Sequence, residues 1–390
     1  MTVFFIAFPY VFLFIILFLL SIPYTAANSL MASAVNIDKL VLSILVIIFF
    51  YAFRGLLFSD WVQYYPAFEK IKILGEPNCF RDNFQNVPWE KGFVIYMMLI
   101  KSIVPNYYIF QAVDFMIVFI SVVCFFRDNL PVKYIPLGCL FFFLFYGEHF
   151  SGNFLRNAKA LIIFLYSIKY IKQRNLVKYI LVNMIGTVFH ITAVFFIPFY
   201  FIAHMKIRKA LLLVFFLAGN IVFLFNISFI KVVLSFFAAY SDSRISTLIS
   251  FYLERKHYSA AYGFTIGYFE RLFTFIYLFI YTERLINIRK ENIIYINSMY
   301  FYLYICLFVS DFYILIERFA ILYVFGYWII YPQLYALLRK HGKYYFLFFL
   351  LCYGSLKVFW GHRDITFLYE NIFFFPRTFY ERTSMLEAWK

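Results

Sequence analysis

Charged residues are scarce in this sequence. Asp, Glu, Lys and Arg together make up 14% of its 390 residues, whereas 64% are hydrophobic and the mean hydropathy is +0.80. Soluble domains carry about a quarter charged residues. A soluble core that held this much apolar surface would leave too few charges to cover its outside. Lipid must therefore be the solvent for most of the chain, which excludes a separate soluble domain of useful size.

Signatures of nucleotide, metal and disulfide chemistry are missing as well. The chain has no GxxxxGK[ST] phosphate loop, HExxH helix, GxSxG elbow or DxD-like metal pair. ATP-driven transport and metalloprotease chemistry therefore have no support. The five cysteines are scattered and show neither metal spacing nor an obvious disulfide pair. We expect no metal and no cofactor.

A large positive charge accompanies this hydropathy. The formal net charge of +15 would suggest a nucleic-acid partner in a soluble protein. Here Lys and Arg cluster in short loops between apolar runs, which is the pattern of cytoplasmic loops in membrane proteins. The sequence therefore predicts a lipid bilayer as the partner and no nucleic acid.

Apolar runs long enough to span a membrane recur along the chain. They predict an all-α polytopic membrane protein with about 10–13 transmembrane helices in a single membrane domain, residues 1–390. The run 177–204 is too long for one pass and is broken by Gly186, His190 and Pro198. The run 92–104 is short and contains Lys101, so we expect a re-entrant or interfacial helix there. The spanning runs lie at about 3–22, 39–53, 107–126, 134–147, 157–172, 207–226, 265–282, 293–310, 318–338 and 343–359.

The basic loops predict the orientation. By the positive-inside rule the cytoplasmic loops are Arg127–Lys133, Lys169–Lys178, His204–Lys209, Arg284–Lys290 and Arg339–Lys343. Both flanks of 177–204 are basic, which predicts a helical hairpin with its tip, near His190, on the outer side. Because successive spans alternate in direction, 54–106 and 227–264 become long extracytoplasmic loops that could carry re-entrant or interfacial helices. This assignment of sides holds only if 92–104 does not span the membrane.

Ionisable residues gather on the predicted outer side. Such groups are costly near lipid and are functional candidates by default, and their number predicts a polar cavity that opens outward. The candidates are Arg54, Asp60, Glu90, His149, Arg156, His190, Asp242, Arg244, Glu270, Arg271, Asp311, Glu317 and Arg318.

Most of these candidates have a structural alternative. Arg54 could cap the helix that it ends, and Asp60 could be a helix N-cap. Glu90 could interact with the dipole of the helix that follows it, and His190 could be a satisfied core or surface histidine. Arg156 is harder to explain structurally, because it opens a helix, where the macrodipole disfavours a cation.

Taken in order, these positions resemble motifs of the EpsG-like, Wzy-type polysaccharide polymerases over roughly residues 40–340. Two motifs depart from the family pattern: Gly55 directly follows the Arg with Ser59 before the Asp, and Asn157 replaces a Gln. The matching segments are Arg54-Gly55 with Ser59-Asp60, Tyr64-Tyr65 and Phe68, then Glu90-Lys91-Gly92-Phe93, Phe154-Leu155-Arg156-Asn157-Ala158, Phe189-His190-Ile191-Thr192-Ala193, and Glu317-Arg318 with Tyr323.

The resemblance implies a GT-C-like membrane glycosyltransferase of the bacterial cytoplasmic membrane. Such an enzyme polymerises undecaprenyl-diphosphate-linked repeat units into O-antigen, capsule or exopolysaccharide on the extracytoplasmic face. Its partners would be the lipid-linked glycan donor and acceptor, with a chain-length regulator and a flippase as further candidates. The alternatives are a lipid-linked glycan flippase or transporter, another GT-C enzyme such as a glycan ligase, and a membrane O-acyltransferase. A transporter usually shows inverted repeats, and no internal repeat is visible.

This reaction would give the candidate residues three roles. Arginines suit a leaving diphosphate, because a guanidinium makes bidentate charge-assisted hydrogen bonds. The diphosphate candidates are Arg156 first, then Arg54, Arg244 and Arg318. The acceptor hydroxyl needs a base, for which the candidates in order are His190, Glu90 and Asp60. Aromatic faces for sugars could come from Tyr64, Tyr65, Trp61 and Trp89, which could equally be interfacial belt residues.

Overall fold

The computed structural model describes residues 2–25, 29–240, 243–254, 263–312, 316, 318–374 and 376–389. These residues are almost entirely helical, and among them the only extended pairing is an isolated antiparallel bridge between Arg54 and Asn371. The predicted all-α polytopic class is confirmed. The contacts divide the chain into two compact units: unit 1 comprises Met1–Ile197 and Tyr331–Lys390, and unit 2 comprises Pro198–Ile330.

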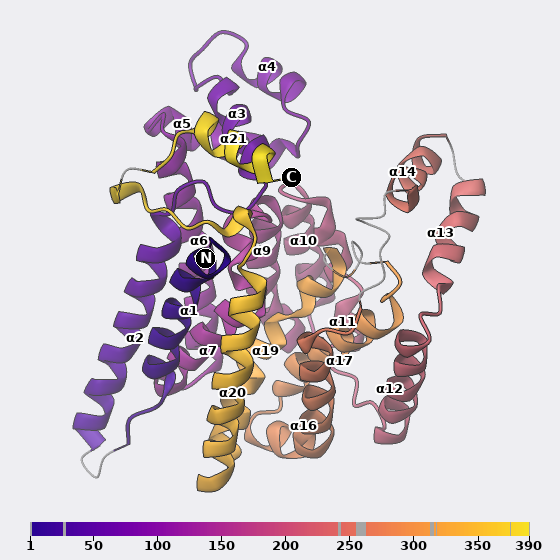
Figure 1. Cartoon of the computed structure of the whole chain (residues 1–390). Helices are drawn as coiled ribbons and strands as arrows, with labels where there is room; N and C mark the ends of the chain where they lie inside the picture. Colours follow the sequence, from indigo (N-terminus) through magenta and orange to yellow (C-terminus); the bar gives the residue numbers. More distant parts are fainter. Residues whose placement is uncertain are drawn as a thin grey trace. The chain divides into compact units, whose positions relative to one another are not determined.

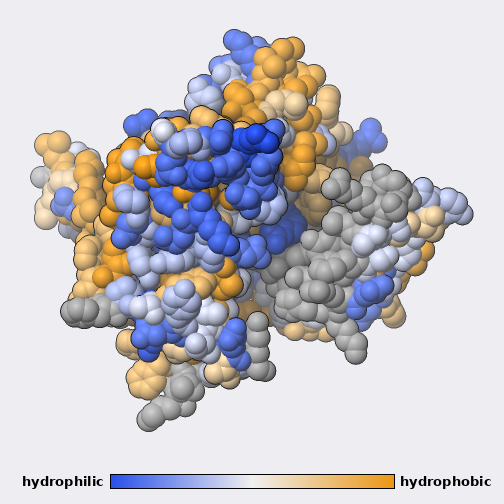
Figure 2. Space-filling model, turned by 90° about the horizontal axis from the view of Figure 1, so that it is seen from above, coloured by the Kyte–Doolittle hydropathy of each residue, from blue (hydrophilic) through white to orange (hydrophobic). Residues whose placement is uncertain are grey.

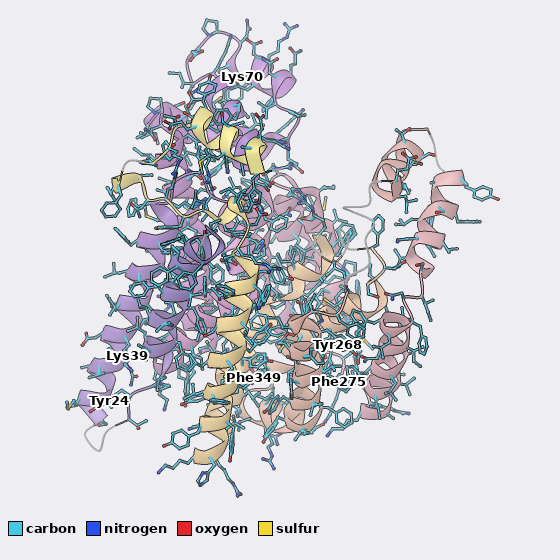
Figure 3. The ribbon with its side chains drawn as sticks, viewed as in Figure 1. Tyr24, Lys39, Lys70, Tyr268, Phe275 and Phe349 are labelled. Carbon is cyan, nitrogen blue, oxygen red and sulfur yellow. The ribbon has the colours of Figure 1, made fainter. Side chains whose placement is uncertain are left out.

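Four helices of unit 1 are long and apolar enough to cross a membrane. They are α1 (Thr2–Ser21), α2 (Ser29–Ala52), α6 (Tyr107–Asn129) and α20 (Lys340–Gly361). Helix α2 begins well before the predicted run at 39, because its polar residues find partners in the preceding connection. Lys39 Nζ donates to the Ile22 carbonyl at 2.6 Å, and Asn36 pairs with both backbone groups of Tyr24 at 3.0 Å. Lys39 and Tyr24 are labelled at this end of unit 1 in Figure 3.

Residues 54–106, which we call the cap, form three short helices at the other end of α2 and α6 (Figure 1). These are α3 (Trp61–Lys70), α4 (Cys79–Asn86) and α5 (Lys91–Ile103). Lys101, which interrupts the apolar run 92–104, donates to the carbonyls of Phe68, Glu69 and Ile71 at 2.7–2.9 Å. It thereby satisfies the C-terminal carbonyls of α3. Helix α5 also packs against α3, α4 and α6, which favours the predicted non-spanning placement.

A broken segment follows α6. The 3-10 turn Val132–Tyr134 leads into α7 (Ile135–Phe142) and the π-helical turn Phe143–Gly147, where Tyr146 takes a φ of 63° and ends the helix. The short α8 (His149–Gly152) then precedes α9 (Leu155–Lys172). The chain therefore reverses direction just before Arg156.

The run 177–204 starts with a hairpin, as predicted. Helix α10 (Leu176–Thr187) is followed by a 3-10 helix (Ile191–Phe196) that packs back against α10 and α9. The Tyr179 hydroxyl donates to the Phe196 carbonyl at 2.5 Å. A Cβ on Gly186 would lie 3.0 Å from Ala193 Cβ, so the absence of a side chain allows this close approach. His190 lies at the tip.

The C-terminal segment closes over the cap. After α20 come the 3-10 turns Ile365–Phe367 and Ile372–Phe374 and then α21 (Phe379–Trp389). The Arg382 side chain is fully buried and donates to the carbonyls of Leu56, Ile365 and Leu368 at 2.9–3.2 Å. Phe379 packs on Tyr65 with a centroid distance of 4.9 Å. Figure 2 shows hydrophilic side chains gathered on the face that the cap presents; exposed charges of the cap are Glu69, Lys70, Glu76, Arg81 and Lys91.

Unit 2 is built around stacked aromatic rings. Phe216 stacks on Phe275 at a centroid distance of 3.6 Å, and Phe223 stacks on Tyr268 at 4.5 Å (Tyr268 and Phe275 are labelled in Figure 3). Its helices are α11 (Phe199–Ile202), α12 (Lys209–Leu224), α13 (Phe229–Tyr240), α14 (Ser243–Glu254), α16 (Ile266–Ile288), α17 (Asn292–Phe308) and the 3-10 helix Ala320–Tyr323, with α19 (Phe325–Leu337) continuing into unit 1.

Contacts within unit 1 join the helix ends that loop charge predicted to share a side. Lys172, near the end of α9, donates to Asn129 at the end of α6 at 2.8 Å. At the opposite ends, Tyr51 of α2 donates to Glu148 at 2.8 Å, and Glu148 lies 2.8 Å from Nε2 of His362, the C-cap of α20. The parity derived from the basic loops agrees with this arrangement.

Candidate functional site

An ion pair between Glu90 and Arg156 lies where the cap meets the start of α9. Arg156 Nη1 donates to Glu90 Oε2 at 2.7 Å, and the two side chains are 25% and 21% exposed. Glu90 is the residue before α5, yet its carboxylate does not cap that helix. It accepts instead from Arg156 and, at 3.3 Å, from the backbone N–H of Ile191. The carboxylate thus offsets the unfavourable position of Arg156 at a helix start.

The electrostatics of Glu90 follow from these contacts. Partial burial raises the pKa of this carboxyl, but backbone hydrogen bonding, Arg156 and His190 lower it by more. The net pKa therefore lies below its ordinary value, and Glu90 is an anion at neutral pH.

His190 faces the same carboxylate from the hairpin tip. Its Nε2 lies 4.0 Å from Glu90 Oε1, too far for a direct hydrogen bond, and its side chain is 12% exposed. Its Nδ1 accepts from the Thr192 backbone N–H at 3.2 Å, which makes His190 the N-cap of the 3-10 helix, and lies 2.8 Å from Thr192 Oγ1. Thr192 Oγ1 in turn donates to Asn157 Oδ1 at 3.2 Å. These contacts hold the imidazole with Nε2 toward Glu90.

Two aromatic rings line the guanidinium. The Tyr64 hydroxyl accepts from Arg156 Nε at 3.3 Å, and Trp89 lies with its ring centroid 5.5 Å from Arg156 Cζ. The two rings are 4.7 Å apart. Burial raises the pKa of Tyr64 to about 12 against the lowering effect of Arg156, so it remains a neutral phenol. Arg156 Nη2 donates to none of the described residues, so this group can serve a ligand.

The backbone around Gly92 holds the elements of this site together. Gly92 N donates to the Val188 carbonyl at 3.1 Å, which ties the start of α5 to the hairpin tip. A Cβ on Gly92 would lie 2.5 Å from Val188 Cγ1 and 2.7 Å from Val188 O. Only glycine allows this approach, which explains the glycine two residues after Glu90.

Asp60 lies at the start of α3, but its carboxylate makes no capping hydrogen bond. The amide oxygen of Asn153 accepts instead from the backbone N–H groups of Ser59 and Asp60 at 3.1 and 3.3 Å. Asp60 thus stands at the N-cap position of α3 without a side-chain capping hydrogen bond.

Three other candidates of the cap are packed into unit 1. Arg54 is 1% exposed and donates to the Tyr51 carbonyl, which is the helix-capping role left open from the sequence. Trp61 is 2% exposed, and its indole N–H donates to the Phe58 carbonyl at 3.0 Å. Tyr65 is half-buried between Tyr107 and Phe379. None of the three is joined by these contacts to the Glu90–Arg156 pair.

The remaining diphosphate candidates belong to unit 2. Arg318 is exposed there. Arg244 lies in α14, and its side chain is outside the described residues, as are Asp242 and Glu317. Glu270 and Arg271 are buried within α16, and Asp311 Oδ2 accepts from the Lys231 backbone N–H at 3.2 Å.

Two buried clusters support the site without contacting it. Lys159, one turn after Arg156, forms an ion pair with Asp114 of α6, and the two side chains are 4% and 0% exposed. Glu148 accepts from Tyr51 and contacts His362, while burial lowers the pKa of His149 to about 4. Glu148 was not among the predicted candidates, which included only its neighbour His149. Within the described residues, no group of three or more His, Cys, Asp or Glu is placed to hold a metal ion.

Fold and site together define an all-α polytopic membrane protein with a charged, aromatic-lined site beside a helical cap. A family model of the EpsG family matches residues 39–376, which is nearly the whole chain. The protein therefore belongs to the EpsG family, a family of Wzy-like polymerases, and a broad role in polysaccharide polymerisation follows. No curated protein and no solved structure gave a match.

Proposed function

We propose that this protein is a glycosyltransferase that joins lipid-diphosphate-linked glycan repeat units, with Arg156, Glu90, His190, Tyr64 and Trp89 as its active site. The observation that carries the proposal is the convergence of a cation, a carboxylate and an imidazole from three separate elements beside two aromatic rings. Family membership supports the polymerase class. Undecaprenyl diphosphate as the carrier and a GT-C-like architecture are part of the proposal.

The reaction needs a leaving group, a nucleophile and a base. The acceptor hydroxyl oxygen attacks the anomeric carbon of the donor while the bond from that carbon to the diphosphate oxygen breaks, and the diphosphate takes the electron pair. Arg156 binds the diphosphate through Nη2 and neutralises the charge that develops there. The hydroxyl proton passes to the imidazole of His190.

Glu90 has two roles in this reaction. It holds the Arg156 guanidinium in place, and it stabilises the imidazolium that forms on His190, in the way that a carboxylate assists a catalytic histidine. The 4.0 Å separation of Nε2 and Oε1 leaves both atoms facing the same space. Trp89 gives sugar rings an apolar face, and Tyr64, which is buried beside it, supports that ring. Asp60 remains a second candidate base at the edge of this site, and the roles of Arg244 and Arg318 remain proposals.

We place the site on the extracytoplasmic face of a bacterial cytoplasmic membrane. The basic loops support this side, because the helix ends that carry the site lie opposite the ends that carry Lys169–Lys178. Donor and acceptor would both be lipid-linked glycans, with a chain-length regulator and a flippase as candidate partners.

The proposal is tested by the surface glycan of a deletion strain that is complemented with variants. Arg156→Ala and His190→Ala should each abolish long polymer and leave single-repeat lipid intermediates, while membrane levels of the protein stay normal. The matched controls Arg127→Ala and His341→Ala remove an exposed arginine and an exposed histidine outside the site and should restore full polymer. Long polymer from both site variants would refute the site. Long polymer that stays unlinked to its final acceptor in the deletion strain would indicate a ligase.

A further inference from the structure

A groove lies in unit 1 between α6, α9 and α10. Its volume is about 670 Å³, within the range of about 300–1,000 Å³ typical of ligand pockets. Most of its wall is aliphatic or aromatic, from residues such as Ile120 and Phe125 of α6, Ile162 and Ile163 of α9, and Val182 and Ile185 of α10. Ile120 and Ile185 are half exposed, so the groove is open along its side.

One end of this groove is polar and cationic. Lys169, Lys172, Tyr166, Asn129 and Asp128 line it. The Lys172 ammonium donates to Asn129 Oδ1 at 2.8 Å, and the Lys169 ammonium lies 3.5 Å from the ring centroid of Tyr166. The Lys172 ammonium is therefore held at the groove by an amide oxygen and the Lys169 ammonium by an aromatic ring.

The charge at this end is positive overall. Asp128 is the one acid of the lining, and Arg127 Nε lies 3.9 Å from its carboxylate. The segment that follows the groove adds Arg174 and contains no acid between residues 169 and 178. An anionic group is consequently favoured here over a zwitterionic one.

The groove is distinct from the candidate active site. Arg156 stands at the start of α9 and Lys172 at its end, and sixteen residues of helix separate them by roughly 24 Å. A ligand headgroup at Lys172 thus cannot reach Arg156.

We infer that this groove binds one anionic phospholipid, with an acyl chain along the apolar wall and the phosphate at Lys169 and Lys172. Basic pockets between membrane helices recognise anionic headgroups in this way. The Tyr166 hydroxyl supplies a hydrogen-bonding group at the headgroup level.

The test is native mass spectrometry of the purified full-length protein in detergent. It is titrated with phosphatidylglycerol or with phosphatidylcholine that has the same acyl chains. One phosphatidylglycerol should be retained per chain, with an apparent Kd at least about tenfold below that of phosphatidylcholine, since each lysine contributes to anionic-lipid attraction. Equal retention of the two lipids overturns the inference.

Two variants and one control locate the site. K169Q/K172Q should remove the preference for phosphatidylglycerol, and Val182→Trp, which fills the apolar wall, should lower the retention of both lipids. The control K133Q/K178Q also removes two exposed positive charges, from residues outside the lining, and should keep the preference. A control that loses the preference as fully as K169Q/K172Q overturns the inference. So does undecaprenyl phosphate that displaces phosphatidylglycerol at equal concentration, because the occupant would then be a polyprenyl lipid.

Discussion

Glu90→Gln is the substitution that probes the site most selectively. It keeps the shape of the side chain and removes its negative charge. Changes in stability and activity therefore arise from the lost interactions with Arg156 and His190. At 2.7 Å, Coulomb attraction is worth about 1.5 kcal/mol at the dielectric constant of water and about 6 kcal/mol at an effective value near 20. After desolvation, a hydrogen bond between charged groups contributes about 1.5–3 kcal/mol.

The partial exposure of the pair decides where in this range it falls. Both side chains keep a fifth to a quarter of their exposure, so we expect a coupling free energy of about 1.5–2 kcal/mol. A double-mutant cycle of Glu90→Gln and Arg156→Gln measures it from the free energies of unfolding of the detergent-purified protein. Polymerising activity of Glu90→Gln should fall about 100-fold or more, because Arg156 loses its orientation and the imidazolium of His190 loses its counterion.

Two results would contradict this prediction. Free energies that add within about 0.5 kcal/mol would show that the pair is not coupled. Wild-type activity in Glu90→Gln would show that the pair, even if coupled, takes no part in the reaction.

Four further predictions concern other parts of unit 1. Gly92→Ala should abolish polymer at normal protein levels, because its Cβ would clash with Val188, whereas Gly361→Ala, which meets nothing within 4 Å, should be silent on glycan gels. Thr192→Val should lower kcat about tenfold and Thr192→Ser should restore it, since the hydroxyl lies 2.8 Å from His190 Nδ1 and holds the imidazole in place; equal rates for both would contradict this. The folded pKa of Glu90 is lowered, so its contribution to stability is complete above its unfolded pKa of about 4.3 and is lost as pH falls through the folded value; thermal unfolding against pH should show this loss for the wild type and not for Glu90→Gln. In a Cys124→Ser/Cys352→Ser background, an impermeant maleimide should label Lys91→Cys in intact cells and Lys178→Cys only after permeabilisation, and the reverse order would contradict the proposed sidedness.

The spanning helices were predictable because apolar length is a direct requirement of the bilayer. The runs 3–22, 107–126 and 343–359 match α1, α6 and α20 closely. The start of α2 was not predictable. Asp38 and Lys39 interrupt the apolar run, but in the structure Lys39 donates to the Ile22 carbonyl. Hydropathy reads the side chain type and takes no account of where a long side chain places its charge.

The candidate site was predictable in its charges and less so in its supports. Glu90, Arg156 and His190 were predicted to lie on the same side of the membrane, and the structure brings them together in unit 1. Asn153, Asn157 and Thr192 were given no role in the predicted site, because the role of an uncharged polar residue becomes clear only when its partner is known. Arg54 and Trp61 carry the right chemistry but are buried by the C-terminal segment, which folds back over the cap through contacts far apart in the chain.

In the proposed function, this chain itself joins lipid-linked repeat units. The direct measurement uses the purified protein, without other enzymes, and an undecaprenyl-diphosphate-linked repeat unit isolated from a strain that lacks it. We predict products that lengthen by whole repeat units with the wild type and none with Arg156→Ala. A folded wild-type protein that binds the substrate and yields no longer product would contradict the account, and so would equal elongation by Arg156→Ala.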